Sequence, residues 1–425
     1  MQRGITNTTF FRLLSTISNF LIALLLARFL GPTVKGDATI FITTITFLVF
    51  FCSFVGGQAL VYLVPRFRVE NLIIPAYIWT ILVAGISYLL FRHFEIFTWR
   101  RSVNICTISI LSSVVNINAA VLLAKKEIRR YNMLNLLPVF ITMLGLLGSI
   151  FIYHIDSIYA YLYPLYGAYF LSVFVSFYFT ARYIRISSSA GVFDDIDSAL
   201  KYGAGYQIFE LLQLLNFRLY FFLLYHLQGP SDLGLFSIGV SILEVVWIFG
   251  RSVFVIHYSD FSNSDNEVVA VRQTLRYIKI VFMTSVLILA LIAICPSSVY
   301  GFVFGASFAD VKYQVKWLFP GVMMYSIALV IQSIYLSRAS YGRLIFAQLI
   351  GLIFSVALCY LWIPNYYYSG ASAAASVSYI TCTVIMLAFF IRDYKVPLSK
   401  FLISSADVDF IKDILKSYMG RGKNV

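Results

Sequence analysis

Residues 13–36 read LLSTISNFLIALLLARFLGPTVKG, a long apolar run that ends in a Gly-Pro turn. A helix of roughly 20 such residues crosses the ~30 Å hydrocarbon core of a bilayer. Similar runs recur along all 425 residues, of which 60% are hydrophobic and only 12% are charged. A soluble domain has about twice that share of charged residues. The composition therefore predicts an all-α membrane protein that crosses the bilayer many times.

The apolar runs predict twelve membrane-spanning helices. The first six cover 13–30, 38–64, 73–90, 103–123, 133–153 and 159–179, and the second six cover 208–227, 235–256, 277–294, 315–336, 344–363 and 371–391. Lysine and arginine concentrate in alternate loops, such as 125–130 and 182–185, which the positive-inside rule places in the cytoplasm. We therefore expect both termini in the cytoplasm. The N-terminal span has no A-x-A-like cleavage site, so we expect it to be retained rather than removed as a signal. The net charge of +13 reflects this loop bias, and no nucleic-acid partner is expected.

The two halves of the sequence share a motif at an offset of 198 residues. Gly31, Pro32 and Gly36 recur as Gly229, Pro230 and Gly234, at the turn between the first two spans of each half. Six spans separate the copies, so both have the same orientation, which predicts two parallel six-helix lobes. The predicted domains are a first lobe (1–190), a linker (191–207), a second lobe (208–395) and a cytoplasmic tail (396–425). Within the tail, 404–419 fits an amphipathic surface helix, and a solvated tail is the alternative.

Three stretches together resemble bacterial polysaccharide exporters of the multidrug/oligosaccharidyl-lipid/polysaccharide (MOP) superfamily, the Wzx-type flippases. They are LARFLGPTVKG (26–36), LQGPSDLGLFS (227–237) and WIPNYYYSGA (362–371) with AAASVSY (373–379). The resemblance implies a two-lobed fold around a central cavity that works by alternating access in the bacterial inner membrane. It also implies a cargo of undecaprenyl-pyrophosphate-linked oligosaccharide, such as an O-antigen repeat unit of lipopolysaccharide. Further partners would be membrane lipids and other polysaccharide-assembly proteins.

Charged residues inside the spans are the candidates for binding this cargo, because a charge in lipid is costly and usually faces a cavity. Arg218 lies midway along its span, about 15 Å from either end by helical rise. Its planar guanidinium suits phosphate oxygens, so we expect Arg218 to contact the diphosphate, with a structural ion pair as the alternative. The other substrate-binding candidates are Arg12, Arg28, Arg251 and Asn216.

Two acidic residues, Glu210 and Glu244, lie on the same spans as Arg218 and Arg251. They are candidates for pairing with these arginines or for accepting a coupling proton. Arg12 and Arg28 lie near the ends of their span, where the default interpretation is that the side chain extends to the interface. At the 198-residue offset, Arg12 corresponds to Glu210, so the two would carry opposite charges at equivalent positions.

No motif for catalysis, a cofactor or a metal is present. The sequence contains no P-loop, GxGxxG or HExxH, and its five cysteines lie in or beside apolar segments without a CxxC pair. Two other functions remain open. A drug/cation antiporter shares the implied fold, although several arginines in the spans would repel a cation. An integral-membrane polysaccharide polymerase usually needs a large external loop, and outer segments such as 91–102 are too short to form one.

Overall fold

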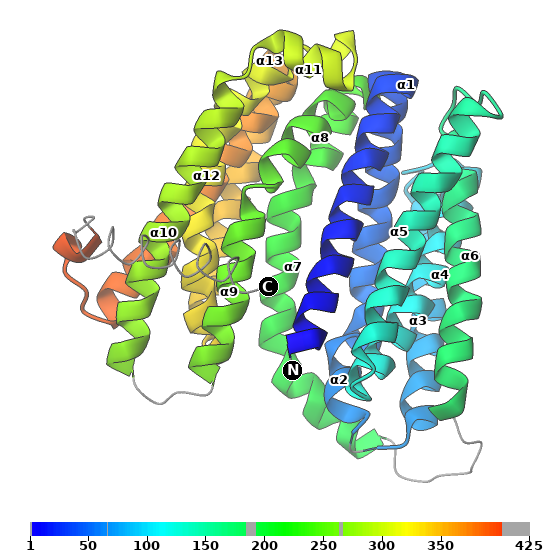
Figure 1. The fold of residues 1–425 in the computed structure, drawn as a ribbon, viewed down its shortest axis with the longest axis horizontal. Helices are drawn as coiled ribbons and strands as arrows, with labels where there is room; N and C mark the ends of the chain where they lie inside the picture. The colour runs from blue at the N-terminus through cyan, green and yellow to red at the C-terminus, as the bar shows by residue number, and fades with distance from the viewer. Residues whose placement is uncertain (1, 66, 184–192, 263–266, 402–425) are drawn as a thin grey trace, which may run out of the picture. The chain divides into compact units, whose positions relative to one another are not determined.

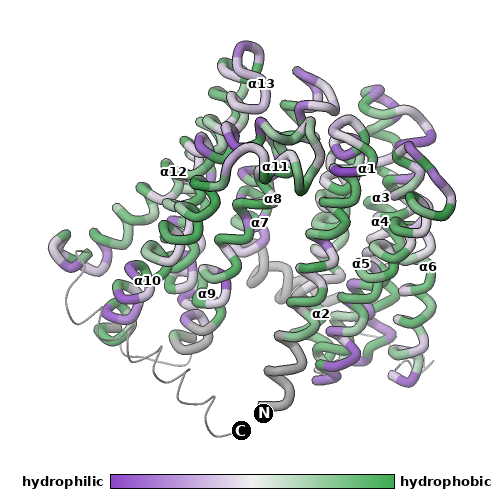
Figure 2. The backbone as a smooth tube through the Cα atoms, turned by 45° about the horizontal axis from the view of Figure 1, so that its top comes forward, coloured by the Kyte–Doolittle hydropathy of each residue, from purple (hydrophilic) through white to green (hydrophobic). Residues whose placement is uncertain are grey.

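The computed structural model describes residues 2–65, 67–183, 193–262 and 267–401 (Figure 1). These residues form helices and short connections with no β-strand, which confirms the predicted all-α class. Nine of the described helices are long and apolar enough to cross a membrane, and a bent pair of helices gives a further span. Figure 2 shows hydrophobic residues along the helices and hydrophilic residues mainly at helix ends and in the connections.

The elements are given in chain order. The first part of the chain forms α1 (Gln2–Gly56), α2 (Gln58–Leu63), α3 (Val69–His93), α4 (Trp99–Ala124), α5 (Ile128–Phe151), α6 (Tyr159–Thr180) and the 3-10 helix η1 (Ala181–Tyr183). The second part forms α7 (Phe193–Gln228), α8 (Pro230–Glu244), α9 (Trp247–Ser262), α10 (Glu267–Ile294), α11 (Ser297–Phe304), η2 (Ala306–Phe308), α12 (Val311–Ser337), α13 (Tyr341–Asp393) and η3 (Leu398–Phe401).

Breaks within the long helices explain how these elements correspond to the twelve predicted spans. Gly31 (φ 78°) divides α1 and Tyr367 (φ 51°) divides α13, each at a turn predicted between two spans. The helices α8 and α9 are bent by 47° with respect to each other, at a break that contains Val245 and Val246. When both parts of α1 and of α13 are counted and α8–α9 is taken as one span, the twelve predicted spans are confirmed.

Several boundaries differ from the prediction. The predicted span 38–64 ends at Gly56, because Gly57 leaves helical geometry and α2 begins as a separate helix. The predicted span 235–256 is broken, and the segment after 294, expected as a loop, contains α11. Helix α7 begins at Phe193, inside the predicted linker 191–207. The predicted tail helix 404–419 lies outside the described residues.

The chain folds into two compact units. Unit 1 comprises Met1–Gln207, Gln228–Ser237 and Gly301–Ala309, and unit 2 comprises Ile208–Leu227, Ile238–Tyr300 and Asp310–Val425. The second Gly-Pro turn and the end of α11 therefore belong to unit 1, although they follow α7 in the sequence.

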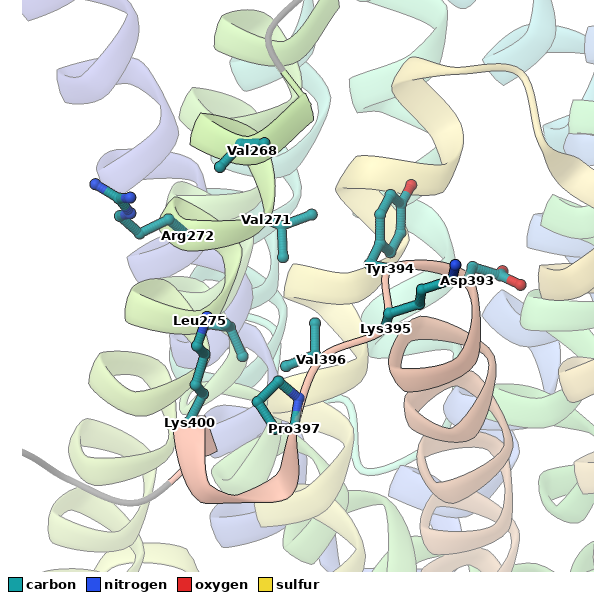
Figure 3. A pocket seen from close by; sticks show the side chains of 10 residues that line it. All are labelled: Val268, Val271, Arg272, Leu275, Asp393, Tyr394, Lys395, Val396, Pro397 and Lys400. Atoms are coloured by element: carbon teal, nitrogen blue, oxygen red, sulfur yellow. The ribbon is translucent and has the colours of Figure 1, made fainter.

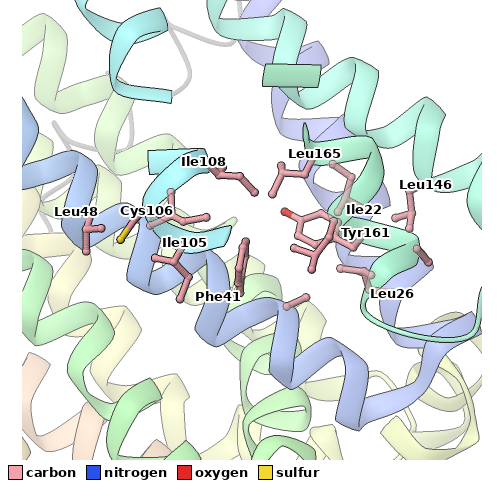
Figure 4. Close-up of a cluster of buried hydrophobic side chains, with 14 of the residues drawn as sticks. Ile22, Leu26, Phe41, Leu48, Ile105, Cys106, Ile108, Leu146, Tyr161 and Leu165 are labelled. Carbon is pink, nitrogen blue, oxygen red and sulfur yellow. The ribbon is translucent and has the colours of Figure 1, made fainter. Parts of the chain in front are cut away.

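The core of unit 1 is an apolar cluster shared by α1, α4, α5 and α6 (Figure 4). Phe41 from α1, Ile105 and Ile108 from α4, and Leu146 from α5 are almost completely buried in it. Helix α3, in contrast, carries apolar side chains on the outside of the protein, since Ile81 and Leu89 are 60% and 66% exposed. In a bilayer such exposed side chains face lipid, and packing rather than removal from water holds the helices together.

Candidate substrate-translocation site

The paired Gly-Pro turns produce a very close helix contact in the part of unit 1 that carries the sequence repeat. Gly31 and Gly229 both have positive φ, at 78° and 90°, which glycine adopts without steric cost. Pro32 and Pro230 then start the next helices, a position where the missing N–H of proline has no partner to lose. The repeat found in the sequence therefore forms the same local structure twice.

The helices that follow these turns meet backbone to backbone. A Cβ added to Gly36 would lie 1.7 Å from the carbonyl oxygen of Pro230, and one added to Gly234 would lie 1.9 Å from that of Pro32. The two contacts are related by the 198-residue offset, so each copy of the motif packs on the proline of the other. Only glycine allows this approach, which explains the Gly-Pro-x-x-x-Gly spacing in physical terms.

Arg28 also serves a structural contact in unit 1. Its Nη1 donates to the carbonyl oxygens of Phe302 and Val303, the latter at 3.3 Å, and its guanidinium lies 5.5 Å from the centre of the Phe302 ring. These carbonyls belong to the last turn of α11, where a cation is favourable because the carbonyls lack helical partners. Its predicted contact with cargo stays a prediction.

Arg218, the main candidate, lies in unit 2 on α7 and forms an ion pair with Glu244. The distance from Nη2 of Arg218 to Oε1 of Glu244 is 3.3 Å, and the two side chains are 29% and 27% exposed. The guanidinium also lies 5.1 Å from the centre of the Phe221 ring, a cation–π contact with the same helix. The structure thus contains one of the pairings that the sequence left open, that of Arg218 with Glu244.

Glu244 is the last residue of α8, so the ion pair lies directly beside the break between α8 and α9. The chain passes the break in a tight turn, in which Val246 N–H donates to Leu243 O at 3.0 Å. Trp247 then begins α9; it is 1% exposed, and its Nε1 donates to Val322 O at 3.1 Å. The break is therefore fixed on both sides by specific contacts.

Four aromatic rings from four helices pack beside this break. Each ring lies between 5.1 and 5.6 Å from each of the other three, measured between ring centres; the rings are those of Phe217, Trp247, Tyr325 and Tyr379. Most pairs meet edge to face or at a tilt, the arrangement that aromatic quadrupoles favour. Phe217 precedes Arg218 in the sequence, so the cluster fixes the part of α7 that carries the guanidinium.

Hydrogen-bonding side chains fill the space next to the aromatic cluster. The hydroxyl of Tyr325 lies within hydrogen-bond distance of the side-chain amides of Gln213, Gln332 and Gln348, at 2.8, 3.0 and 2.9 Å. Tyr220 and Tyr379 share a hydrogen bond between their hydroxyls. A network of this size inside a membrane domain fixes the mutual positions of α7, α12 and α13.

Asn216 belongs to this network and is 0% exposed. Its Nδ2 donates to the backbone and side-chain oxygens of Gln348 at 2.7 and 2.8 Å, and its Oδ1 accepts from Ser378 at 2.9 Å. All of its polar side-chain atoms are therefore used in joining α7 to α13. Contact with a cargo would require Asn216 to leave these partners, so its predicted role stays a prediction.

The remaining candidates are less closely defined. Glu210 is half-buried on α7, and Arg251 is exposed on α9. The side chain of Arg12 lies outside the described residues. Residues that the sequence did not single out include Trp247, Tyr325, Tyr379 and Gln348. No local pattern marks them, because their proximity depends on how α9, α12 and α13 pack against α7.

Unit 2 also contains a separate cavity of about 470 Å³ between α10 and the segment that follows α13 (Figure 3). None of the predicted site residues lines this cavity; its lining is Val268, Val271, Arg272, Leu275, Asp393, Tyr394, Lys395, Val396, Pro397 and Lys400. Among the described residues, no group of three or more His, Cys, Asp or Glu side chains could hold a metal ion.

Comparisons with known proteins show similarity at the level of the fold. No protein-family model matches the sequence, and no curated protein matches it. Solved structures match in fold. An inward-facing multidrug resistance MATE family transporter of the MOP superfamily has a TM-score of 0.72 at 10% identity, over 90% of this chain and 94% of that chain. The lipid II flippase MurJ in an inward closed conformation has a TM-score of 0.72 at 13% identity, over 94% of this chain and 89% of that chain.

A third similar structure is a MOP superfamily transporter from Pyrococcus furiosus, with a TM-score of 0.58 at 12% identity, over 92% of this chain and 93% of that chain. At such low identity the likeness defines the fold and not the cargo. The chain has the fold of MOP-superfamily transporters, a class that includes both flippases and multidrug transporters.

Proposed function

We propose that this protein is a flippase that carries an undecaprenyl-pyrophosphate-linked oligosaccharide from the cytoplasmic to the periplasmic leaflet of a bacterial inner membrane. The oligosaccharide is a repeat unit of O-antigen or of a similar surface polysaccharide. The protein works by alternating access between its two six-helix lobes and is a transporter rather than an enzyme. Both termini lie in the cytoplasm, and the protein works beside other polysaccharide-assembly proteins.

The observation that carries the proposal is the position of Arg218. It is a permanent cation in the middle of a membrane-spanning helix, and its side chain keeps 29% of its surface exposed although it pairs with Glu244. Neither side chain of the pair is fully enclosed, and a charge left exposed to lipid is costly. The exposed part is the part that an anionic group can approach. Arg251, another of the substrate-binding candidates, is exposed on α9 of unit 2.

The same charges argue against the second candidate, a drug/cation antiporter with the same fold. A cationic cargo needs an acidic residue that is not already neutralised. Glu244 is engaged by Arg218 in the described structure. A cationic cargo would have to compete with Arg218 for this carboxylate, whereas a diphosphate carries more negative charge than Glu244 and can compete with it for the guanidinium.

A flipping assay with defined lipid-linked glycans tests the proposal. The purified protein in proteoliposomes should move the lipid-linked oligosaccharide to the opposite leaflet, where a glycosidase added outside can cleave it. Arg218→Ala should abolish this movement. Arg218→Lys should retain part of it, because lysine keeps the charge but lacks the planar guanidinium that can bind two phosphate oxygens at once. Transport of a cationic dye with no movement of the glycan would show that the protein is a drug/cation antiporter and not a flippase.

A matched control separates a site effect from a general effect of losing an arginine. Arg130 lies in unit 1 at the start of α5, where it forms an ion pair with Glu127 at 2.9 Å. Arg130→Ala should leave flipping close to the wild-type rate. A loss of flipping in Arg130→Ala as large as that in Arg218→Ala would contradict a specific role for Arg218.

A further inference from the structure

Glu244 has two roles in the structure that no other described residue combines. Its carboxylate is the anion that pairs with Arg218, and its backbone is the last residue of α8 before the break. If Arg218 binds a phosphate group, the carboxylate of Glu244 occupies the place that a phosphate oxygen would take. A change in the contacts of this carboxylate would therefore act directly on the last residue of α8, next to the break.

The ion pair is of a kind that a stronger anion can replace. Its N–O distance of 3.3 Å exceeds the 2.7–2.9 Å that is usual for a hydrogen bond between charged groups. A guanidinium has five N–H donors, and this contact uses one nitrogen. Among the described residues, no second carboxylate pairs with Arg218. A diphosphate offers more negative charge and more oxygens, so it can hold the guanidinium through two parallel bonds.

The two sides of the break are fastened differently. The end of α8 is fastened to α7 by the Glu244–Arg218 pair. The start of α9 is fastened by Trp247, which is buried, bonded to Val322 and packed 5.2 Å from Phe217. Loss of the ion pair would remove this contact at the last residue of α8 and leave the contacts of Trp247 in place, so the bend between the two helices is the element expected to respond.

We propose that Glu244 is a displaceable counter-ion: the cargo's diphosphate takes its place on Arg218, and the release of Glu244 changes the bend between α8 and α9. This rests on the proposed function, and it assigns to Glu244 a positioning role that couples binding to movement. Without cargo, Glu244 compensates the charge of Arg218 and holds the bend. With cargo, the lipid diphosphate compensates that charge, and the end of α8 is free to move.

The first test measures lipid binding to the full-length protein in nanodiscs. Three probes differ only in the head group: undecaprenyl diphosphate, undecaprenyl monophosphate and undecaprenol. Glu244→Gln keeps the shape of the side chain and removes the competing charge, so it should bind the diphosphate lipid about tenfold more tightly than wild type. Binding of undecaprenol should not change. Unchanged or weaker binding of the diphosphate lipid by Glu244→Gln would overturn the proposal.

The second test measures hydrogen exchange of the backbone amides around Val245 and Val246. The diphosphate lipid should increase exchange at these amides in wild type, and Glu244→Gln should show the increase without lipid. No increase in either case would overturn the link to the bend. Glu127→Gln is the control, because this acid pairs with Arg182 at 2.5 Å within unit 1. It should behave as wild type in both tests.

The two proposals can fail separately. If Glu244→Gln tightens binding of the diphosphate lipid and the protein moves no lipid-linked glycan, the counter-ion role stands and the flippase function is wrong. If the glycan is flipped and Glu244→Gln changes neither binding nor exchange, the flippase function stands and the counter-ion role is wrong.

Discussion

The two copies of the Gly-Pro turn have the same backbone, yet the helices on either side of them differ. In the first copy, the second part of α1 runs from Pro32 to Gly56 without a break. In the second copy, α8 ends at Glu244 after 15 residues, and α9 continues at an angle of 47°. At the 198-residue offset, the partners Arg218 and Glu244 correspond to Phe20 and Thr46.

The side chains at these equivalent positions also differ between the two copies. Phe20 packs edge-on against Phe304 at 6.1 Å, and the hydroxyl of Thr46 donates to the carbonyl of Ile42 in its own helix. Neither residue carries a charge. The turn is thus present in both copies, where it fixes how the helices cross. The charged pair occurs only in the second copy, which also has its helix break earlier, after Glu244 rather than at the position equivalent to Gly57. This difference is the reason for placing the proposed cargo recognition in unit 2.

The most direct test of this difference between the copies is to give the second copy the uncharged residues of the first. We expect the double variant Arg218→Phe/Glu244→Thr to reach the membrane and fold, because removing both charges leaves neither one unpaired in the membrane. Export of the glycan should fall by at least about 100-fold, since the diphosphate loses its cation. Surface polysaccharide, with protein level measured in the membrane fraction, reports both quantities.

The opposite result has a clear meaning. If the pair is only structural, the uncharged double variant should export nearly as well as wild type, while Arg218→Ala alone should not. Rescue of surface polysaccharide in Arg218→Ala/Glu244→Gln or Arg218→Ala/Glu210→Gln would lead to the same conclusion and would defeat the diphosphate assignment.

The fold could be predicted to a large extent from the sequence, because each span is determined locally by about 20 apolar residues. Gly31 and the pair Gly229–Pro230 also marked their turns, since the backbone there needs glycine and proline. The break after Glu244 could not be predicted in this way. Val245 and Val246 continue the apolar run without a glycine or proline, so the break depends on tertiary contacts such as those of Trp247.

The glycines that allow the close crossing should be the next most sensitive positions, and equally so in both copies. Gly36→Ala and Gly234→Ala each place a Cβ within 2 Å of a proline carbonyl, so the helices must separate. We expect each to lower the free energy of unfolding by about 2–3 kcal/mol. Gly148→Ala is the control, because nothing lies within 4 Å of its added Cβ. Unfolding in detergent measures all three, and a tolerated alanine at one copy alone would show that the crossing is not symmetric.

Asn216 should contribute less than the crossing but more than its counterpart in the first copy. Asn216→Ala leaves the oxygens of Gln348 and the hydroxyl of Ser378 without their present partner inside unit 2. The expected loss is about 2 kcal/mol, because unsatisfied buried polar groups are destabilising. Unfolding curves of the variant, together with flipping by the fraction that remains folded, distinguish a structural role from a contact with cargo.

The candidate site was predicted less completely than the fold. Arg218 and Glu244 were found because a charge in an apolar span is conspicuous. Their pairing was left open, since the sequence does not show which faces of two helices meet. Asn216 was expected to face cargo, and the structure places it among the partners that join α7 to α13. The same uncharged polar side chain can serve either purpose, so only the packing of α13 distinguishes them.

The smallest expected effect is at Ser18, which corresponds to Asn216 at the 198-residue offset. Ser18 is 1% exposed, and its hydroxyl has no hydrogen-bond partner among the described residues. An unsatisfied buried hydroxyl is unfavourable, so Ser18→Ala should leave stability unchanged or raise it by up to about 1 kcal/mol. The same unfolding measurement as for Asn216→Ala gives the comparison, with the two substitutions acting in opposite directions. If Ser18→Ala instead destabilises the protein as much as Asn216→Ala does, then the first copy also depends on a buried polar contact. The proposed difference, in which the first copy serves only helix packing and the second also binds cargo, would then not hold at this position.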